Sequence, residues 1–199
     1  MNGLKLPETF YERTNVVRIA RDLLGKSLFT KTDGAITGGM IVETEAYSWK
    51  ERGSHAYDAR KTARNAVMFG PGGHAYVYMC YGIHFLFNVV TNSTDTADAV
   101  LIRALEPHTG IETMEARRGK LANRYHLTSG PGKLTRALGI NRQWNGRSLL
   151  DDDVWITDNS TRLSPADIVA SPRIGIDYAG EDAALPWRFT IKNNRWVSK

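Results

Sequence analysis

Apolar residues recur along parts of the chain at the spacing of one helical face, which predicts amphipathic helices there. The clearest stretch is 16–24, where valine, isoleucine, alanine and leucine follow this spacing. Thr14 or Asn15 would cap its start, and Gly25 follows its end. Two more helices are expected: 110–118, behind a capping box from Thr109 to Glu112, and 132–138.

Alternating or continuous apolar runs predict strands elsewhere. Residues 28–29 lead through Asp33 and Gly34, a typical hairpin turn, into a long strand over 36–47. Further strands are expected over 76–81, 85–90, 100–105, 173–176 and 187–191, and an irregular segment over 141–171. Because strands come in consecutive groups with helices before and after them, the sequence predicts an α+β fold. We expect a single domain over residues 1–199, with a curved, mostly antiparallel β-sheet packed by helices.

Composition describes a globular protein with a basic surface. The chain has 199 residues, 42% of them hydrophobic and 24% charged, and the lone Cys80 excludes an intrachain disulfide. Its apolar runs are too short to span a bilayer, and the first eight residues lack a secretory pattern. We therefore expect a cytoplasmic protein without membrane association. The net charge of +5 suits a phosphate backbone as partner, although such charge is also common on solvated surfaces.

The strand over 40–47 holds two glutamates and a tyrosine at alternate positions. Alternation puts Glu43, Glu45 and Tyr47 on one face with Ile41, and it points the remaining residues toward the core: Met40, Val42, Thr44 and Ala46. Two carboxylates beside an aromatic ring are typical of a cleft wall, although both could simply be exposed. A partly buried carboxylate can act as a general base near neutral pH.

Two later segments suggest nucleic-acid contacts. Tyr76, Tyr78 and Tyr81 fall within six residues ahead of Gly82, and rigid rings suit base stacking or insertion into DNA. Packing inside a sheet is the alternative, and it is the role expected for Tyr76. The segment 129–134 fails the Walker pattern, but its glycine-rich helix start could bind a DNA phosphate.

Three classes of function stay open on these residues alone. One is a hydrolase that uses a glutamate base, and another is a basic RNA- or ribosome-binding module. The third is a metal-dependent nuclease built on Glu43 and Glu45. None of the five histidines shows HxH or HExxH spacing, so no metal site is expected from them.

Several motifs occur together in an order that resembles one family. They are residues 41–47, Arg64-Asn65-x-x-Met68-Phe69, 76–82, Asn88, 101–107 and 129–134. The sequence resembles the alkyladenine (N-methylpurine, 3-methyladenine) DNA glycosylase family from about residue 7 to Ser198. This resemblance implies a monofunctional base-excision-repair enzyme that flips a damaged purine out of the duplex and hydrolyses its N-glycosidic bond. The implied partner is double-stranded DNA carrying 3-methyladenine, ethenoadenine or hypoxanthine, bound by a monomer at the nucleoid without a cofactor.

The resemblance also implies a role for individual residues. Glu45 would activate the attacking water, and Arg103 and the carbonyl of Ile174 would position it. Tyr81 would intercalate into the gap left by the flipped base. The base pocket would be formed by Tyr47, His55, Tyr78 and Asn88, with Asn88 disfavouring guanine, and the DNA backbone would be bound by Arg60, Arg64 and Lys133. Three positions depart from the family pattern, Ala59, Ala63 and Ile83, and they put the lesion range in doubt.

Overall fold

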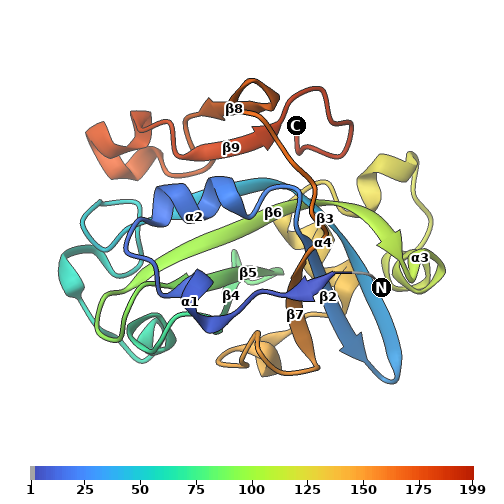
Figure 1. Cartoon of the computed structure of the whole chain (residues 1–199), viewed down its shortest axis with the longest axis horizontal. Coiled ribbons are helices and arrows are strands. Elements are labelled where there is room, and N and C mark those ends of the chain that lie inside the picture. Colours follow the sequence, from blue (N-terminus) through green and yellow to red (C-terminus); the bar gives the residue numbers. More distant parts are fainter. Residues whose placement is uncertain (1–2) are drawn as a thin grey trace.

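Two long antiparallel strands run through the middle of the molecule (Figure 1). The computed structural model describes residues 3–199. β3 (Ala35–Tyr47) and β6 (Asp98–Thr109) pair along most of their lengths, with bulges between Ile41 and Thr44. On the other edge of β3, the first half pairs with β2 (Ser27–Thr32) and residues 43–45 pair with β9 (Arg188–Ile191). The edge therefore changes partner beside the two glutamates.

The remaining strands extend this pair into one sheet. Across it the order is β1 (Leu4–Lys5), β7 (Val154–Asp158), β2, β3, β6, β5 (His84–Thr91) and β4 (Ala75–Cys80), while β8 (Ile168–Ser171) pairs with β9. Every pairing is antiparallel. The predicted α+β class with a mostly antiparallel sheet is confirmed.

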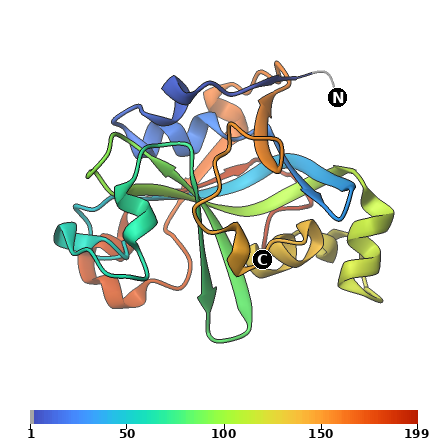
Figure 2. The ribbon, with the colours of Figure 1, turned by 90° about the horizontal axis from the view of Figure 1, so that it is seen from below.

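Two helices cover opposite sides of the β3–β6 pair, as Figure 2 shows for α2 (Val16–Asp22) and α4 (Pro131–Leu138). The Thr44 hydroxyl on β3 donates to the carbonyl of Ala20 in α2 at 2.8 Å, so Thr44 faces this helix. The other helices lie in the connections: α1 (Glu8–Tyr11), α3 (Ile111–Arg118) and the 3-10 helices Tyr57–Ala59, Ala66–Phe69, Arg124–Leu127, Arg142–Trp144, Pro165–Asp167 and Asp177–Ala184. Among residues 3–199, no helix combines the length and apolar character needed to cross a bilayer.

The first predicted helix and the hairpin turn are confirmed in detail. Asn15 is the cap of α2, because its side chain accepts a hydrogen bond from the Arg18 N–H at 2.9 Å. Asp33 and Gly34 both have positive φ, as the turn between β2 and β3 requires. The capping box expected ahead of α3 is wrong. The helix begins after Gly110, which has a φ of 66° and provides no side-chain cap.

Two predictions for the second half of the chain are wrong. Residues 141–171 are not irregular throughout, because β7 joins β1 to β2 and its apolar residues Val154 and Ile156 are fully buried. The strand expected over 173–176 is absent, since this segment forms bends and Gly175 has a φ of 76°.

One alternative left open by the sequence, that both glutamates on β3 are simply exposed, is wrong. Neither glutamate is exposed: Glu43 and Glu45 are as fully buried as Thr44 and Ala46 between them. Both faces of this half of β3 are covered, one by α2 and the other by side chains of β6 and the C-terminal segments. Burying two carboxylates requires donors close by, and those donors form the site.

Candidate active site

A cavity of about 900 Å3 lies beside the second half of β3, between the β4–β5 hairpin, β6 and the glycine-rich turn ahead of α4. Its lining brings together side chains from distant parts of the chain, among them Tyr47, His55, Tyr78, Asn88 and Arg103. All five were expected as site residues from the sequence, and the structure places them around one space, called the pocket below.

Glu45 lies directly behind the pocket wall. Its Oε2 accepts hydrogen bonds from the Tyr47 hydroxyl at 2.8 Å and from Arg103 Nη1 at 3.2 Å. Its Oε1 accepts one from the backbone N–H of Ile174 at 2.8 Å. All three donor residues line the pocket, whereas the Glu45 side chain is fully buried. The carboxylate is thus held in a fixed orientation against the cavity.

The charges around Glu45 keep its donors protonated. Burial raises the pKa of Tyr47 well above its ordinary value, and the charge of Glu45 and its hydrogen bond raise it further. Burial opposes the charge on Arg103, but Glu45 and Glu43 outweigh it and raise the pKa of that guanidinium. Both groups therefore donate to the carboxylate over the physiological pH range.

Aromatic side chains form another part of the pocket lining. The His55 and Tyr78 ring centroids are 4.5 Å apart, and Tyr76 lies behind them with its hydroxyl 2.9 Å from His55 Nδ1. Tyr76 is 1% exposed, so the packing role expected for it is consistent with its place. Burial, with a smaller contribution from the Arg64 charge, lowers the pKa of His55 to about 4. The ring is consequently neutral near pH 7.

A sequence model described as methylpurine-DNA glycosylase (MPG) matches residues 9–195 of the chain. The chain is 48% identical to a protein of Carboxydothermus hydrogenoformans, over 98% of both chains. It is 46% identical to one of Methanoculleus marisnigri, over 98% of this chain and the whole of the other. Both relatives are named as 3-methyladenine DNA glycosylases.

The chain belongs to the methylpurine-DNA glycosylase family. The resemblance inferred from the sequence motifs is thereby confirmed. This protein is a hydrolytic DNA glycosylase of base excision repair, and DNA is its substrate.

The three cationic residues expected to contact DNA lie in two different places, two in the pocket lining and one outside it. Arg64 and Lys133 line the pocket of this glycosylase, and the Arg64 guanidinium lies 5.1 Å from the centroid of the Tyr78 ring. Arg60 is exposed outside the pocket lining. Arg64 therefore lies beside an aromatic side chain of the pocket, whereas Arg60 lies outside the pocket.

Tyr81 lies at the tip of the β4–β5 hairpin, which projects from the body of the glycosylase in Figure 2. Tyr81 and Gly82 have φ values of 51° and 70°, which form a tight turn that displays the ring. The Tyr81 side chain is 86% exposed, and Ile83 beside it is 73% exposed. The hairpin therefore exposes two large side chains at its tip, and of these Tyr81 also lines the pocket.

Sequence reasoning missed several residues of the site. Arg173 forms a buried two-pronged ion pair with Glu51, at 2.6 and 2.7 Å, and its guanidinium lies 4.7 Å from the Tyr47 ring centroid. Tyr178 and Ser198 also line the pocket. No local pattern marks these residues, because their partners lie more than a hundred positions away along the chain. The Ile174 carbonyl was expected to position the attacking water, which stays a prediction, and the structure adds a hydrogen bond from the Ile174 N–H to Glu45.

A metal site on the two glutamates does not fit this geometry. Glu43 Oε1 accepts from Arg103 Nε at 2.8 Å and from Arg188 Nε at 2.7 Å, so two cations already occupy its surroundings. Within residues 3–199, no three His, Cys, Asp or Glu side chains are grouped as metal ligands. The environment of Glu43 is that of a paired carboxylate.

Proposed function

We propose that this glycosylase flips a damaged purine out of duplex DNA into the pocket and hydrolyses its N-glycosidic bond with a water activated by Glu45. Purines of the 3-methyladenine, ethenoadenine and hypoxanthine type are the proposed substrates, and a monomer is the proposed active form. The observation that carries the proposal is the buried Glu45 carboxylate, held by three donors that themselves line the pocket.

The hydrogen bonds of Glu45 leave room for the attacking water. A carboxylate has about four acceptor positions, and three of them are taken, two on Oε2 and one on Oε1. The remaining position on Oε1 is available to accept a proton from water between Tyr47, Arg103 and Ile174. The deprotonated water attacks C1′ while positive charge develops on the deoxyribose, and the nearby carboxylate stabilises that charge. The product is an abasic site.

The aromatic residues of the pocket suit a flipped purine. Tyr47, His55 and Tyr78 supply π faces to the pocket lining, and stacking on such faces favours electron-poor or cationic bases. Asn88 donates to the carbonyl of Tyr76 at 3.1 Å, so its side chain is held in one orientation. We propose that it disfavours guanine through the exocyclic amino group. Tyr81 would fill the gap left in the duplex.

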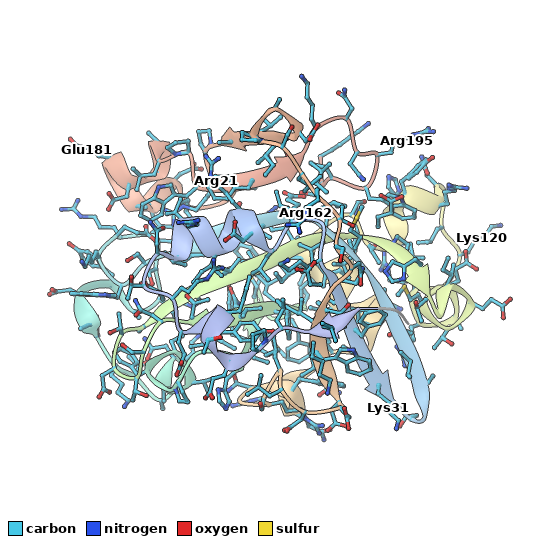
Figure 3. The ribbon with its side chains drawn as sticks, in the orientation of Figure 1. Arg21, Lys31, Lys120, Arg162, Glu181 and Arg195 are labelled. Carbon is cyan, nitrogen blue, oxygen red and sulfur yellow. The ribbon has the colours of Figure 1, made fainter. Side chains whose placement is uncertain are left out.

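Cationic side chains surround the proposed DNA path. Arg64 and Lys133 line the pocket, and Arg60 is exposed outside it. Farther out, Lys120 and Arg195 project from the end of the molecule that holds α3 (Figure 3). We propose that Arg60, Arg64 and Lys133 contact phosphates on either side of the flipped nucleotide.

The experiment that tests this function uses a duplex carrying one ethenoadenine or one hypoxanthine. The enzyme is incubated with it in the presence of a chelator, and the strand is then treated with alkali, which cleaves at any abasic site. We expect cleavage after alkali and an intact strand before it. An intact strand after alkali with both lesions, together with no release of 3-methyladenine from methylated DNA, would contradict the proposed function. Abolition of excision by the chelator would contradict the metal-independent mechanism.

A further inference from the structure

A second buried carboxylate lies next to the proposed general base. Glu43 is fully buried, and its Oε1 accepts from Arg103 Nε at 2.8 Å, Arg188 Nε at 2.7 Å and Ser198 Oγ at 2.8 Å. Its Oε2 accepts from the backbone N–H of Ser198 at 2.7 Å. Arg188 Nη2 also donates to the carbonyl of Ser198 at 3.2 Å. Ser198 is thus bound to Glu43 through two atoms and to Arg188 through a third.

Arg103 connects this cluster to the site. Its Nε binds Glu43 and its Nη1 binds Glu45, so one guanidinium bridges the two carboxylates. A guanidinium is a rigid plane. Once the Nε–Glu43 bond is made, the direction of Nη1, and with it the contact to Glu45, is largely determined.

The charges in the cluster are arranged so that Glu43 is ionised and anchored. Burial raises the pKa of Glu43, but the Arg103 charge, the Ser198 N–H and Arg188 outweigh it and hold that pKa below its ordinary value. Arg188 supplies a second positive charge to Glu43, so Arg103 can also donate a hydrogen bond to Glu45. Burying four charged groups is an inefficient way to gain stability compared with apolar packing. Arg103 and Ser198 both line the pocket, which points to a task in the site.

We propose that Glu43 and Ser198 are positioning residues that fix Arg103 against Glu45. This inference rests on the proposed role of Glu45 as the general base. Neither residue contacts the substrate in this scheme. Glu43 orients Arg103, and Ser198 orients Glu43 through its hydroxyl and its N–H.

The test compares four single variants, and Glu43→Gln again in an Arg103→Lys background, with the wild-type enzyme on an ethenoadenine duplex. Glu43→Gln removes the anchor charge, Ser198→Ala removes the hydroxyl donor, and Ser198→Pro removes the N–H donor as well. Ser171→Ala is the matched control, because Ser171 Oγ accepts from Arg188 Nη1 at 3.4 Å but does not touch Glu43. Single-turnover excision rates, dissociation constants for the lesion duplex and melting temperatures are measured for each.

We expect Glu43→Gln to lower the excision rate about tenfold to a hundredfold while lesion binding changes less than about threefold, since small misplacements of catalytic groups have effects of this size. Ser198→Pro should exceed Ser198→Ala in its effect, and Ser171→Ala should match the wild type. In an Arg103→Lys background, Glu43→Gln should add less than about twofold, because lysine cannot bridge both carboxylates. If Glu43 has a purely structural role, DNA affinity, melting temperature and excision rate should instead fall together. The rate losses of Glu43→Gln and Arg103→Lys should then multiply in the double variant.

The outcomes separate this inference from the proposed function. Glu43→Gln and both Ser198 variants with wild-type rates would overturn the positioning role while leaving Glu45 as the base. If Glu43→Gln does not fold, the two Ser198 variants decide the question, because Ser198 lies outside the helices and strands. An active Glu45→Gln variant would overturn the proposed function itself.

Discussion

At the scale of single residues, the site depends on side chains that perform two tasks at once. Tyr47 presents its ring to the pocket and donates its hydroxyl to Glu45 at 2.8 Å. Arg173 packs its guanidinium 4.7 Å from the same ring and binds Glu51 with both terminal nitrogens. Tyr47 is therefore held from behind by a cation while its hydroxyl orients the carboxylate.

This double role predicts a separation of binding from chemistry in Tyr47→Phe. The ring remains, so binding to an ethenoadenine duplex should change less than about twofold. The lost hydrogen bond to a charged acceptor contributes about 1.5–3 kcal/mol, so single-turnover excision should slow by roughly tenfold to a hundredfold. Tyr47→Leu, the control that also removes the ring, should weaken binding. Equal binding losses in both variants would contradict the role of the hydroxyl.

His55 should remain neutral well below the ordinary histidine range. Its pKa is lowered from 6.5 to about 4, first by burial and then by the Arg64 charge. The folded protein then binds fewer protons than the unfolded chain between these values. Its contribution to stability is complete above pH 6.5 and is lost as the pH falls toward 4. Titration of the ring nitrogens by NMR should give a midpoint near 4. A midpoint near 6.5 would contradict a desolvated ring.

At the scale of elements, the long β3 strand and the β4–β5 hairpin carry different residues of the site. β3 carries Glu43, Glu45 and Tyr47 inside the fold, where both faces are covered. The hairpin carries Tyr78 on the pocket wall and Tyr81 at its exposed tip. The buried strand holds its side chains rigidly, and the projecting turn is the element proposed to enter the duplex.

Tyr81→Ala tests the reach of the hairpin. A ring stacked in the gap contributes about 1–3 kcal/mol, so binding to a paired lesion should weaken by roughly tenfold to a hundredfold. The rate of the chemical step should stay within about threefold once the base is in the pocket. Binding titrations are compared for a lesion opposite a normal partner and opposite a mismatch, where opening is easier. Equal losses in both contexts would argue against insertion by Tyr81.

Elements governed by local sequence could be predicted, whereas those fixed by distant contacts could not. The cap at Asn15 and the turn at Asp33 and Gly34 depend on neighbouring residues alone. β7 is stabilised by pairing with β2, more than a hundred positions earlier, and nothing in its polar surroundings indicated a partner. The same limit applied to the site. Glu45 and Tyr47 were found together because they lie two residues apart on one strand.

Two hydrogen-bond partners of the glutamates could not be predicted as such, because they lie far from the glutamates in the sequence. Ser198 is 155 residues from Glu43, and Ile174 is 129 residues from Glu45. Both residues bind their glutamate through a backbone N–H, which leaves no trace in a sequence pattern, and Ser198 adds its hydroxyl. The motif identified the family and the carboxylate, and only the fold identified what holds the carboxylate in place.

At the scale of the whole molecule, positive charge is spread widely over the surface. The net charge is +5, and the lining of the pocket includes Arg64, Arg118 and Lys133. Lys31, by contrast, lies near the end of the β2–β3 hairpin and is absent from the pocket lining (Figure 3). This distribution suits a long polyanion that crosses the mouth of the pocket.

Affinity for undamaged duplex DNA should therefore fall steeply with salt. Each neutralised phosphate contributes about 0.9 to the slope of log affinity against log salt. Lys133→Ala should reduce that slope by about one, and Lys31→Ala, the control outside the pocket, should leave it unchanged. Titrations at four salt concentrations measure both slopes. A flat plot for the wild-type protein would contradict a phosphate-dominated interface.

The central claim is that the buried Glu45 carboxylate activates the attacking water, and Glu45→Gln tests it most directly. The substitution keeps the size of the side chain but removes its charge and its basicity. Glu106→Gln on β6 is the matched control, because Glu106 accepts from Asn194 Nδ2 at 2.7 Å and does not line the pocket. Single-turnover excision of ethenoadenine is measured with enzyme in excess, alongside binding to the same duplex. For Glu45→Gln alone we expect unchanged binding and a rate about 10²–10⁴-fold below wild type. A rate within about tenfold of the wild-type value would contradict the claim.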